Sequence, residues 1–307
     1  MATMMQAVAA RPKTQRINPW LKSETWFAFL FILPSMIGFI LFFAVPTVRG
    51  LLISFTNWDL LTPAKSVGIA NYQKLLSDAD FWKALLVTLN YVVINIFFQT
   101  LLAILIAVLM DRLTQSIFVR GVLILPYLFS NVVVALLWLW MLDPTLGIVN
   151  SFLTWIGIGR QPFFGSPGQA IATVAGINIW RHMGYTALLV FAGLQTIPKS
   201  LYEAAAIDGA SEVRTFLGIT LPLLRPVLVF VLVTTIIGSF QVFDTIAITT
   251  KGGPAGATRV IMWYIYEFAF GRFNMGYATA LSMALFLIVI GITLIQMRVL
   301  RANESDL

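Results

Sequence analysis

The amino-acid sequence predicts an all-α, polytopic membrane protein with six transmembrane helices. Of its 307 residues, 59% are hydrophobic and 11% are charged, whereas about a quarter of the residues of an ordinary soluble domain are charged. Mostly apolar runs, each near the ~20 residues that a helix needs to cross a bilayer, account for this composition. We expect spans at residues 26–48, 84–110, 122–142, 170–196, 226–250 and 277–297.

The first run follows a polar segment, residues 1–25, which contains Arg11, Lys13 and Arg16. A cleaved signal peptide has an apolar core of only about 7 to 15 residues and ends in a small-residue cleavage site. The run at 26–48 is longer and carries Pro34 and Pro46. We therefore interpret it as a retained anchor, with residues 1–25 and 301–307 as tails and residues 26–300 as one transmembrane domain.

Basic residues set the expected orientation, because Lys and Arg are enriched on the cytoplasmic side of membrane proteins. The excess of Lys and Arg on one side of the membrane is weak for this chain, so the expected orientation depends mostly on the basic N-terminal tail. This choice places both termini and the loops at 111–121 and 197–225 in the cytoplasm. The outer loops are richer in turn-forming residues and are too short to be domains.

Composition also excludes several classes of function. The formal charge of +7 comes from basic residues scattered among apolar spans, not from a stripe that follows a phosphate backbone, so we expect no nucleic-acid partner. The chain has no cysteine and one histidine, which excludes thiolate metal sites and cysteine nucleophiles and leaves no imidazole cluster for zinc. We therefore expect no metal and no catalytic residue.

The loop at 198–222 is predicted to form a helical hairpin. Ser200 followed three residues later by Glu203 is a capping box that starts a helix over residues 201–207. Gly209 then permits the positive φ of a sharp reversal. Ala204 and its neighbours are small, so a partner protein can approach this helix closely.

The second half of the hairpin begins at Ser211 and Glu212, which open a helix that reaches about Gly218. Pro222 and Pro226 are expected to end it before the next span. A capped loop with no further role remains the alternative, because such turn and cap signals are common.

Polar side chains gather on one face of the second span, where Asn90, Tyr91, Asn95 and Gln99 follow a spacing of about four. Amide and hydroxyl groups together with aromatic rings are the partners that sugar hydroxyls need. Further candidates for a substrate pathway lie in the later spans: Asn131, Asn178, Trp180, His182, Tyr185 and Gln241. Interhelical hydrogen bonds are the alternative role for each of them.

Two charged residues lie within predicted spans. A charged side chain at the bilayer centre costs about 2.5 to 3.5 kcal/mol on insertion scales, so Arg181 must face protein or water. Asp244 is the acidic residue at similar depth. We expect Arg181 and Asp244 to face a translocation cavity and to lie close enough to couple, with a structural ion pair or an outward-turned Arg181 as alternatives.

The hairpin also carries a spaced pattern: Glu203-Ala204-Ala205, three residues, Gly209, nine residues, then Ile219, Leu221 and Pro222. In this it resembles the coupling loop of ATP-binding-cassette (ABC) importer permeases of the maltose and glycerol-3-phosphate permease group. The similarity extends from about Trp26 to the C-terminus and includes residues 67–72, 192–198, 252–254 and 276–280. The large outer domain and extra N-terminal spans of the longest maltose permeases are missing, so glycerol phosphate, disaccharides and oligosaccharides stay equally open as cargo.

The resemblance implies a type I ABC importer permease in a bacterial cytoplasmic (inner) membrane. It implies a second permease subunit of similar fold, two ABC ATPase subunits and an extracytoplasmic solute-binding protein that delivers a sugar or sugar-like solute. By the same resemblance, the ATPases contact the coupling loop at Glu203, Ala204, Ala205, Asp208, Gly209, Ile219, Leu221 and Pro222. ATP and Mg would be bound by those ATPase subunits and no cofactor by this chain, which has no phosphate-binding Gly-x-x-x-x-Gly-Lys motif.

Two other classes of membrane protein are the alternatives. A carrier driven by an ion gradient is expected to have paired broken helices and buried carboxylates, of which Asp244 is the convincing example. An enzyme embedded in the membrane needs clustered His, Asp or Ser groups on facing helices, and the sequence shows no such cluster.

Overall fold

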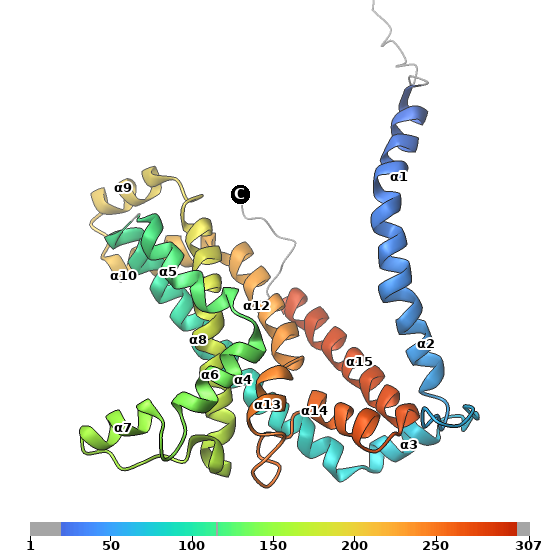
Figure 1. Ribbon diagram of the computed structural model, residues 1–307. Coiled ribbons are helices and arrows are strands. Elements are labelled where there is room, and N and C mark those ends of the chain that lie inside the picture. The colour runs from blue at the N-terminus through green and yellow to red at the C-terminus, as the bar shows by residue number, and fades with distance from the viewer. Residues whose placement is uncertain (1–19, 115, 300–307) are drawn as a thin grey trace, which may run out of the picture. The chain divides into compact units, whose positions relative to one another are not determined.

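The structure is a computed structural model that describes residues 20–114 and 116–299, and within these ranges the regular elements are helices, apart from one isolated antiparallel bridge between Thr56 and Ser66. The chain divides into two units, Met1–Leu52 and Ile53–Leu307. The helical course of each unit can be followed in Figure 1.

The first unit is a long apolar helix made of α1 (Trp20–Phe39), a π-helical turn η1 (Ile40–Ala44) and α2 (Val45–Ile53). The helix begins at Trp20, inside the segment expected to be a polar tail, while the apolar span within it begins at Trp26, as predicted. Residues 1–19 lie outside the described part. The π turn ends at Ala44, two residues before Pro46, which has no N–H to donate and disturbs the regular helical ladder.

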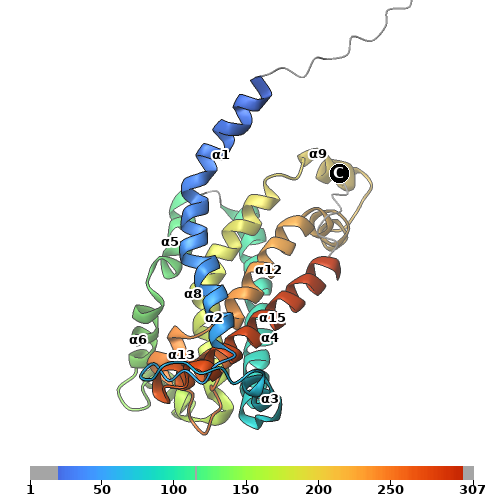
Figure 2. The same ribbon diagram turned by 90° about the vertical axis from the view of Figure 1, so that its right-hand side faces the viewer.

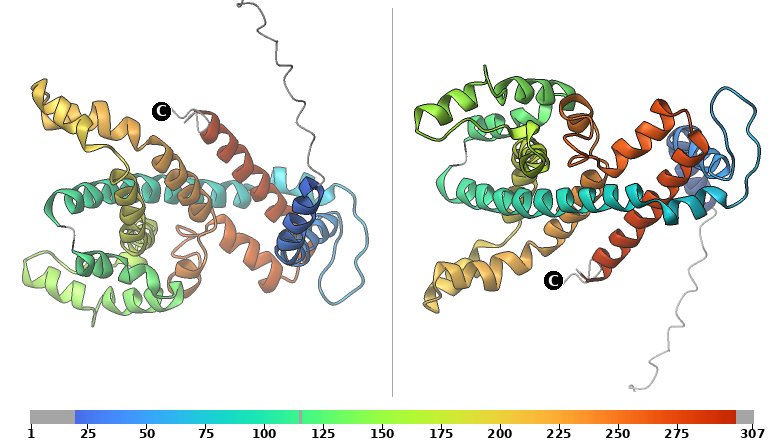
Figure 3. Two further views of the ribbon diagram at one scale, coloured as in Figure 1. Left: turned by 90° about the horizontal axis from the view of Figure 1, so that it is seen from above. Right: turned by 90° about the horizontal axis from the view of Figure 1, so that it is seen from below.

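The second unit contains two long helices, α4 (Ala79–Leu113) and α8 (Pro167–Leu194), which pack against each other. Seen from below in Figure 3, α4 runs past α8 toward α15 (Met275–Val299). The shorter helices of this unit are α3 (Ala70–Ser77), α5 (Ile117–Leu128), α6 (Asn131–Met141), α7 (Ile148–Trp155), η2 (Phe163–Gly165), α9 (Lys199–Ile207), α10 (Glu212–Thr215), η3 (Phe216–Thr220), α11 (Leu221–Leu223), α12 (Arg225–Phe240), α13 (Asp244–Thr249), α14 (Ile261–Tyr266) and η4 (Glu267–Gly271). Within this unit, α9 and α10 lie at one end of α8, and α13 and α14 lie toward the other (Figures 1 and 2).

Several helices are long and apolar enough to cross a membrane. Four meet both criteria by themselves, Trp26–Ile53, Ala79–Leu113, Arg225–Thr249 and Met275–Val299, and the bent pair α5 and α6 gives a fifth. The helix α8 is 28 residues long, but Asn178, Arg181 and His182 make it less apolar. The count of six spans therefore remains a prediction that rests on α8 being the sixth.

Two of the predicted spans are interrupted. The expected continuous helix at 122–142 is wrong, because α5 ends at Leu128 and α6 begins at Asn131 after a bend of 91°. Pro126 lies in the last turn of α5 and removes one of its backbone donors. The expected span at 226–250 is present as the candidate span Arg225–Thr249, within which residues 241–243 interrupt the helix between α12 and α13.

Small residues bring the helices of this unit close together. Ala103 and Ala107 of α4 are fully buried, as are Ala187 and Val190 of α8. At Gly184, a Cβ atom would lie 1.8 Å from the carbonyl oxygen of Leu123, so glycine is needed where α5 crosses α8. By contrast, many large apolar side chains of α4 point outward, as expected of a surface that faces lipid or a second subunit.

Candidate functional site

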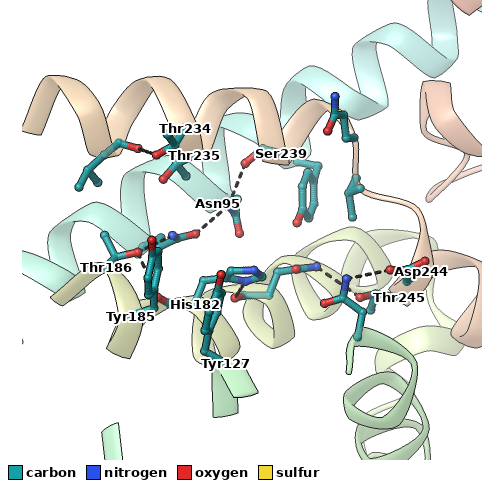
Figure 4. A pocket seen from close by; sticks show the side chains of 18 of the residues that line it. Asn95, Tyr127, His182, Tyr185, Thr186, Thr234, Thr235, Ser239, Asp244 and Thr245 are labelled. Atoms are coloured by element: carbon teal, nitrogen blue, oxygen red, sulfur yellow. Dashed lines mark hydrogen bonds between the residues drawn. The ribbon is translucent and has the colours of Figure 1, made fainter. Parts of the chain in front are cut away.

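A cavity of about 460 Å³ opens between α4, α5, α8, α12 and α13. Its volume lies in the range of ~300 to 1,000 Å³ that is usual for small-ligand sites. The lining combines aromatic rings with amide, hydroxyl and carboxylate groups, and several of these side chains point toward one another in Figure 4. The cavity therefore suits a small polar solute.

The predicted polar face of the second span forms one wall of this cavity. Tyr91, Asn95 and Gln99 line it and are 1%, 4% and 5% exposed. Asn90 instead lies on the exposed side of α4. The Asn95 amide Nδ2 donates to Gln99 Oε1 at 3.1 Å and to Ser239 Oγ at 3.0 Å, which ties α4 to α12.

The broken spans supply the opposite wall. Asn131 is the first residue of α6 and Asp244 the first residue of α13, and the Asn131 Nδ2 donates to Asp244 Oδ2 at 2.7 Å. Asn178 Nδ2 reaches Thr245 Oγ1 at 3.4 Å. The first residue after each break, Asn131 or Asp244, thus brings a polar side chain to the cavity.

An aromatic stack completes the lining. The rings of Tyr127 and Tyr185 lie nearly parallel, at 10°, with centroids 4.4 Å apart. Both residues line the cavity (Figure 4). Tyr185 belongs to the predicted set of site residues, as do Asn95, Gln99, Asn131, Asn178, His182, Gln241 and Asp244, and the structure brings this set together around one cavity.

Trp180 and Arg181 are not among the lining residues of the cavity. The Trp180 ring packs edge-on against Trp138, with centroids 5.4 Å apart. Arg181 donates to the carbonyl oxygens of Tyr127 and Phe129 at the 91° bend. The expectation that Arg181 lines the cavity is therefore corrected, since the hydrogen bonds of its guanidinium go to the bend and to His182. Asp244 hydrogen-bonds to Asn131 and forms no ion pair with Arg181, but the two charges are close enough to interact electrostatically, as expected.

Sequence reasoning missed several lining residues, namely Tyr127, Thr186, Thr234, Thr235, Ser239 and Thr245. A signal for some of them was present. Thr235 and Ser239 are four residues apart in an otherwise apolar helix and so share a face with each other. Tyr127 gave no such signal, because its position depends on the bend.

The predicted hairpin is present at one end of the second unit. Its first helix, α9, ends at a reversal in which Gly209 has a φ of 69°. The Ala210 N–H donates to Ala205 O and the Gly209 N–H to Ala206 O, the pattern of a Schellman cap with glycine in the left-handed position. The predicted start was wrong: α9 begins at Lys199 after Pro198, and no side-chain hydrogen bond caps it.

The second half of the hairpin starts as expected and ends later than expected. Ser211 is the N-cap of α10, and its Oγ accepts from the Arg214 N–H. The helix then continues through the π-helical η3 into α11, so Pro222 does not stop it near Gly218. The π turn is the physical reason, because it shifts the hydrogen-bonding register and ends two residues before Pro222, as η1 does before Pro46.

The hairpin is exposed along much of its surface and tied to α4 at its base. Glu203, Ala204, Asp208 and Gly209 are exposed, Ala205 is buried, and Pro222 is more exposed than Ile219 and Leu221. Arg112, near the end of α4, forms an ion pair with Glu212 at 2.6 Å. Tyr202 and Thr220 join the two halves through their hydroxyl groups at 3.1 Å.

A helical membrane unit that combines a polar cavity between its spans with an exposed hairpin at one end is the architecture of a transport permease. The chain belongs to the family described as binding-protein-dependent transport system inner membrane component, whose model matches residues 99–302. The class predicted from sequence, a multi-pass ABC importer permease, is thereby confirmed.

Relatives and solved structures agree with this family. The chain is 36% identical over 273 residues to the sn-glycerol-3-phosphate transport system permease protein UgpA of Agrobacterium fabrum, covering 88% of this chain and 93% of that protein. It is 32% identical to the trehalose/maltose transport system permease protein MalF of Thermococcus litoralis, covering 92% and 96%. A crystal structure of a bacterial ABC transporter that imports the acidic polysaccharide alginate matches with a TM-score of 0.81 and 27% identity, covering 93% of this chain and 99% of that one.

These relatives do not favour the alternative of an ion-driven carrier. The structure does show two broken spans and a carboxylate at the cavity, which are features that we expected of carriers. Broken helices therefore do not distinguish the two classes here, and the family membership does.

Proposed function

We propose that this chain forms one half of the translocation pathway of an ABC importer for a sugar or sugar-like solute. The main observation in support is the cavity, because its amide, hydroxyl and aromatic groups are of the kind that bind sugar hydroxyls. Relatives of this chain are named for trehalose and maltose, for glycerol 3-phosphate and for alginate. In the proposed assembly, a second permease of similar fold closes the other side of the pathway.

The hairpin α9 to α11 is the proposed contact for the ATPase subunits, with the hairpin end, both chain termini and the 111–121 loop in the cytoplasm. Ile207 and Val213 on either side of its turn are 86% and 68% exposed, and exposed apolar patches of this kind mark interaction sites. Glu203 and Asp208 are exposed beside them. The ATPase subunits bind ATP and Mg and hydrolyse the nucleotide, while this chain moves the solute.

The helix α4 provides a rigid link between the hairpin and the cavity. Its last turn carries Asp111 and Arg112, which bind Gln195 at 2.6 Å and Glu212 at 2.6 Å. Asn95, in its middle, lies 17 residues earlier, or about 25 Å along the helix at 1.5 Å per residue. A movement of the hairpin is thus transmitted to the cavity wall by one continuous helix. In the proposed cycle the pathway alternates between an inward-facing and an outward-facing state, and delivery of solute by an extracytoplasmic binding protein shifts the balance between these states.

Purification of the intact assembly tests this proposal. The full chain, isolated with a tag from its native membrane, is expected to bring a second permease, a nucleotide-hydrolysing subunit and a solute-binding protein. ATP hydrolysis should rise when the loaded binding protein is added. Uptake that persists without any ATPase subunit and collapses with the ion gradient would identify a carrier instead.

Cross-linking tests the hairpin contact separately. The chain has no cysteine, so Ala204→Cys introduces a unique thiol on the exposed face of α9. A reagent that joins thiols to lysines is expected to couple this position to the ATPase subunit. Ala64→Cys, at an exposed position of the loop after α2, is the matched control and should yield no ATPase product; equal yields at both positions would contradict the contact.

A further inference from the structure

A directional chain of hydrogen bonds runs through the cavity wall. The carbonyl oxygen of His182 can only accept, so the Thr186 hydroxyl donates to it, at 3.0 Å. Thr186 Oγ1 therefore accepts from Gln99 Nε2 at 2.9 Å, which leaves Gln99 Oε1 to accept from Asn95 Nδ2 at 3.1 Å. The backbone carbonyl thus fixes the orientation of both amide side chains.

This chain ends in an acceptor without a partner. The Asn95 Oδ1 is buried and has no hydrogen-bond partner, and Asn95 lines the cavity with 4% of its surface exposed. The other amide atom, Nδ2, is already used twice, toward Gln99 and Ser239. A buried acceptor of this kind is stabilised by a group that brings a hydrogen to it.

The charged group of the wall is also an acceptor. Asp244 lines the cavity and has one carboxylate oxygen, Oδ2, bound to Asn131. Among the described lining residues, none is Lys or Arg. The guanidinium of Arg181 next to the wall interacts electrostatically with Asp244 but does not line the cavity, and its hydrogens go to the carbonyl oxygens of Tyr127 and Phe129 and to His182.

The single imidazole of the wall is neutral by its hydrogen bonds. Arg181 Nη1 has only hydrogens to give, so His182 Nε2 accepts from it at 2.9 Å. His182 Nδ1 then carries the hydrogen and donates to Asn178 O at 2.9 Å. The other polar groups of the wall are hydroxyls and amides, which can either donate or accept a hydrogen bond. Asn95 Oδ1 and the Asp244 carboxylate can only accept, so these two groups decide which cargo groups the wall prefers.

We propose that the cargo of this permease is an uncharged, hydroxyl-rich solute, and not a phosphorylated or acidic sugar. Hydroxyl groups donate to the Asp244 carboxylate and, once the side chains that cover it are displaced, to the buried Asn95 Oδ1. The acidic group of a phosphorylated or acidic sugar adds acceptors and a second negative charge beside Asp244. This inference rests on the proposed sugar-importer function and goes beyond it. The named relatives include both a glycerol-3-phosphate permease and a trehalose/maltose permease, so similarity alone leaves the charge of the cargo open.

Transport by the complete assembly in proteoliposomes tests the charge of the cargo. The probes are a panel of neutral mono-, di- and oligosaccharides, glycerol 3-phosphate, and alginate oligosaccharides. We expect ATP-dependent uptake of a neutral saccharide and no uptake of the two anions. Uptake of an anion overturns this inference and leaves the proposed function standing, whereas failure of every probe counts against the proposed sugar import itself.

Two variants test the assigned acceptors. The transport measurements on the wild-type assembly do not depend on whether these variants fold. Asp244→Asn and Asn95→Leu should each lower neutral uptake at subsaturating cargo roughly tenfold, as expected for a lost hydrogen bond to cargo. Asp59→Asn is the matched control, because Asp59 accepts hydrogen bonds only within its own exposed turn, and it should transport normally. Unchanged uptake in both cavity variants would contradict the assigned acceptors.

Discussion

The guanidinium of Arg181 caps the broken end of α5, with Nη2 at 2.8 Å and Nε at 3.2 Å from the carbonyl oxygen of Phe129. Nη2 also lies 3.1 Å from the carbonyl oxygen of Tyr127. The last carbonyls of a helix lack intrahelical donors, and a cation at this end is favourable to the helix dipole. Arg181 therefore stabilises a 91° bend that would otherwise leave polar backbone unpaired within the membrane.

We expect the fork of donors at Arg181, and not its charge alone, to be essential for transport. In Arg181→Lys, one ammonium group replaces a planar fork that binds two carbonyls and His182, so the bend loosens and Tyr127 loses its place in the cavity wall. Uptake should fall about tenfold or more, as expected for lost charged hydrogen bonds. Uptake by the reconstituted transporter measures this.

Arg181→Gln serves as the companion variant, because it lacks the charge but keeps one amide donor. If capping is the role of Arg181, both variants transport poorly. Full activity in Arg181→Lys together with loss in Arg181→Gln would show that only the positive charge matters.

Glycine at position 184 is expected to set the packing of α5 on α8. In Gly184→Ala, the new methyl group would lie 1.8 Å from Leu123 O, so the two helices must separate. Overpacking of this kind costs about 1 to 3 kcal/mol, and the thermal midpoint of the purified protein in detergent should fall.

The same helix provides a matched control at Gly176, whose added Cβ would have nothing within 4 Å. Gly176→Ala should leave the midpoint unchanged or raise it, because alanine is the better helix former. Equal midpoints for the two variants would show that α5 does not approach α8 as closely as described.

The sequence was sufficient to identify several apolar spans, the hairpin and part of the cavity, because each depends on local signals. Runs of apolar residues mark spans, and Gly209 marks a reversal that no other residue makes as easily. The polar face at Asn95 and Gln99 was recognised from its spacing, since polar groups in a span must meet protein or water.

Some errors are local, such as the capping box expected at Ser200, and the main one concerns contacts between residues that are distant in the sequence. Arg181 was expected to bind Asp244 because both are charged and lie at similar depth, but a bent span offered carbonyl acceptors that no sequence pattern marks. Asp244 in turn bonds to Asn131, 113 positions earlier. Likewise, the helix through Pro222 persists because a π turn precedes it, an adjustment of the backbone that is not encoded in any single residue type.

The turn at Gly209 is expected to couple the hairpin to ATP hydrolysis. Valine at a φ of 69° is strained, and even a simple L side chain costs about 1 to 2 kcal/mol in the left-handed region. Gly209→Val should therefore displace α10 relative to α9. We expect assembly of the transporter to persist while ATP hydrolysis loses its stimulation by the loaded binding protein.

The matched control is Gly218→Val, because Gly218 is exposed, has helical φ and would have nothing within 4 Å of its Cβ. This variant should retain stimulated hydrolysis. Wild-type uptake in Gly209→Val would argue strongly that the hairpin is not the coupling element.

The carboxylate of Asp78 is expected to fasten three helices together. It caps the N-terminus of α4, accepting from the backbone N–H groups of Asp80 and Phe81. Its Oδ2 also accepts from the hydroxyls of Tyr264, at 2.6 Å, and Tyr277, at 2.5 Å. Burial disfavours the charged form, but the hydroxyl and N–H donors outweigh it and hold the pKa of Asp78 below its usual 3.8.

A carboxylate with a depressed pKa in the folded state stabilises the protein above the pKa of the unfolded state, and this contribution is lost as the pH falls through the folded-state pKa. Asp78→Asn should therefore lower the thermal midpoint at neutral pH, because the amide keeps only part of the acceptor capacity. The difference between wild type and variant should shrink as the pH drops below 3.8. Tyr264→Phe, which removes one of the hydroxyl donors, is expected to reduce this pH dependence; a midpoint difference for Asp78→Asn that is the same at neutral pH and below 3.8 would show that the charge of Asp78 does not contribute.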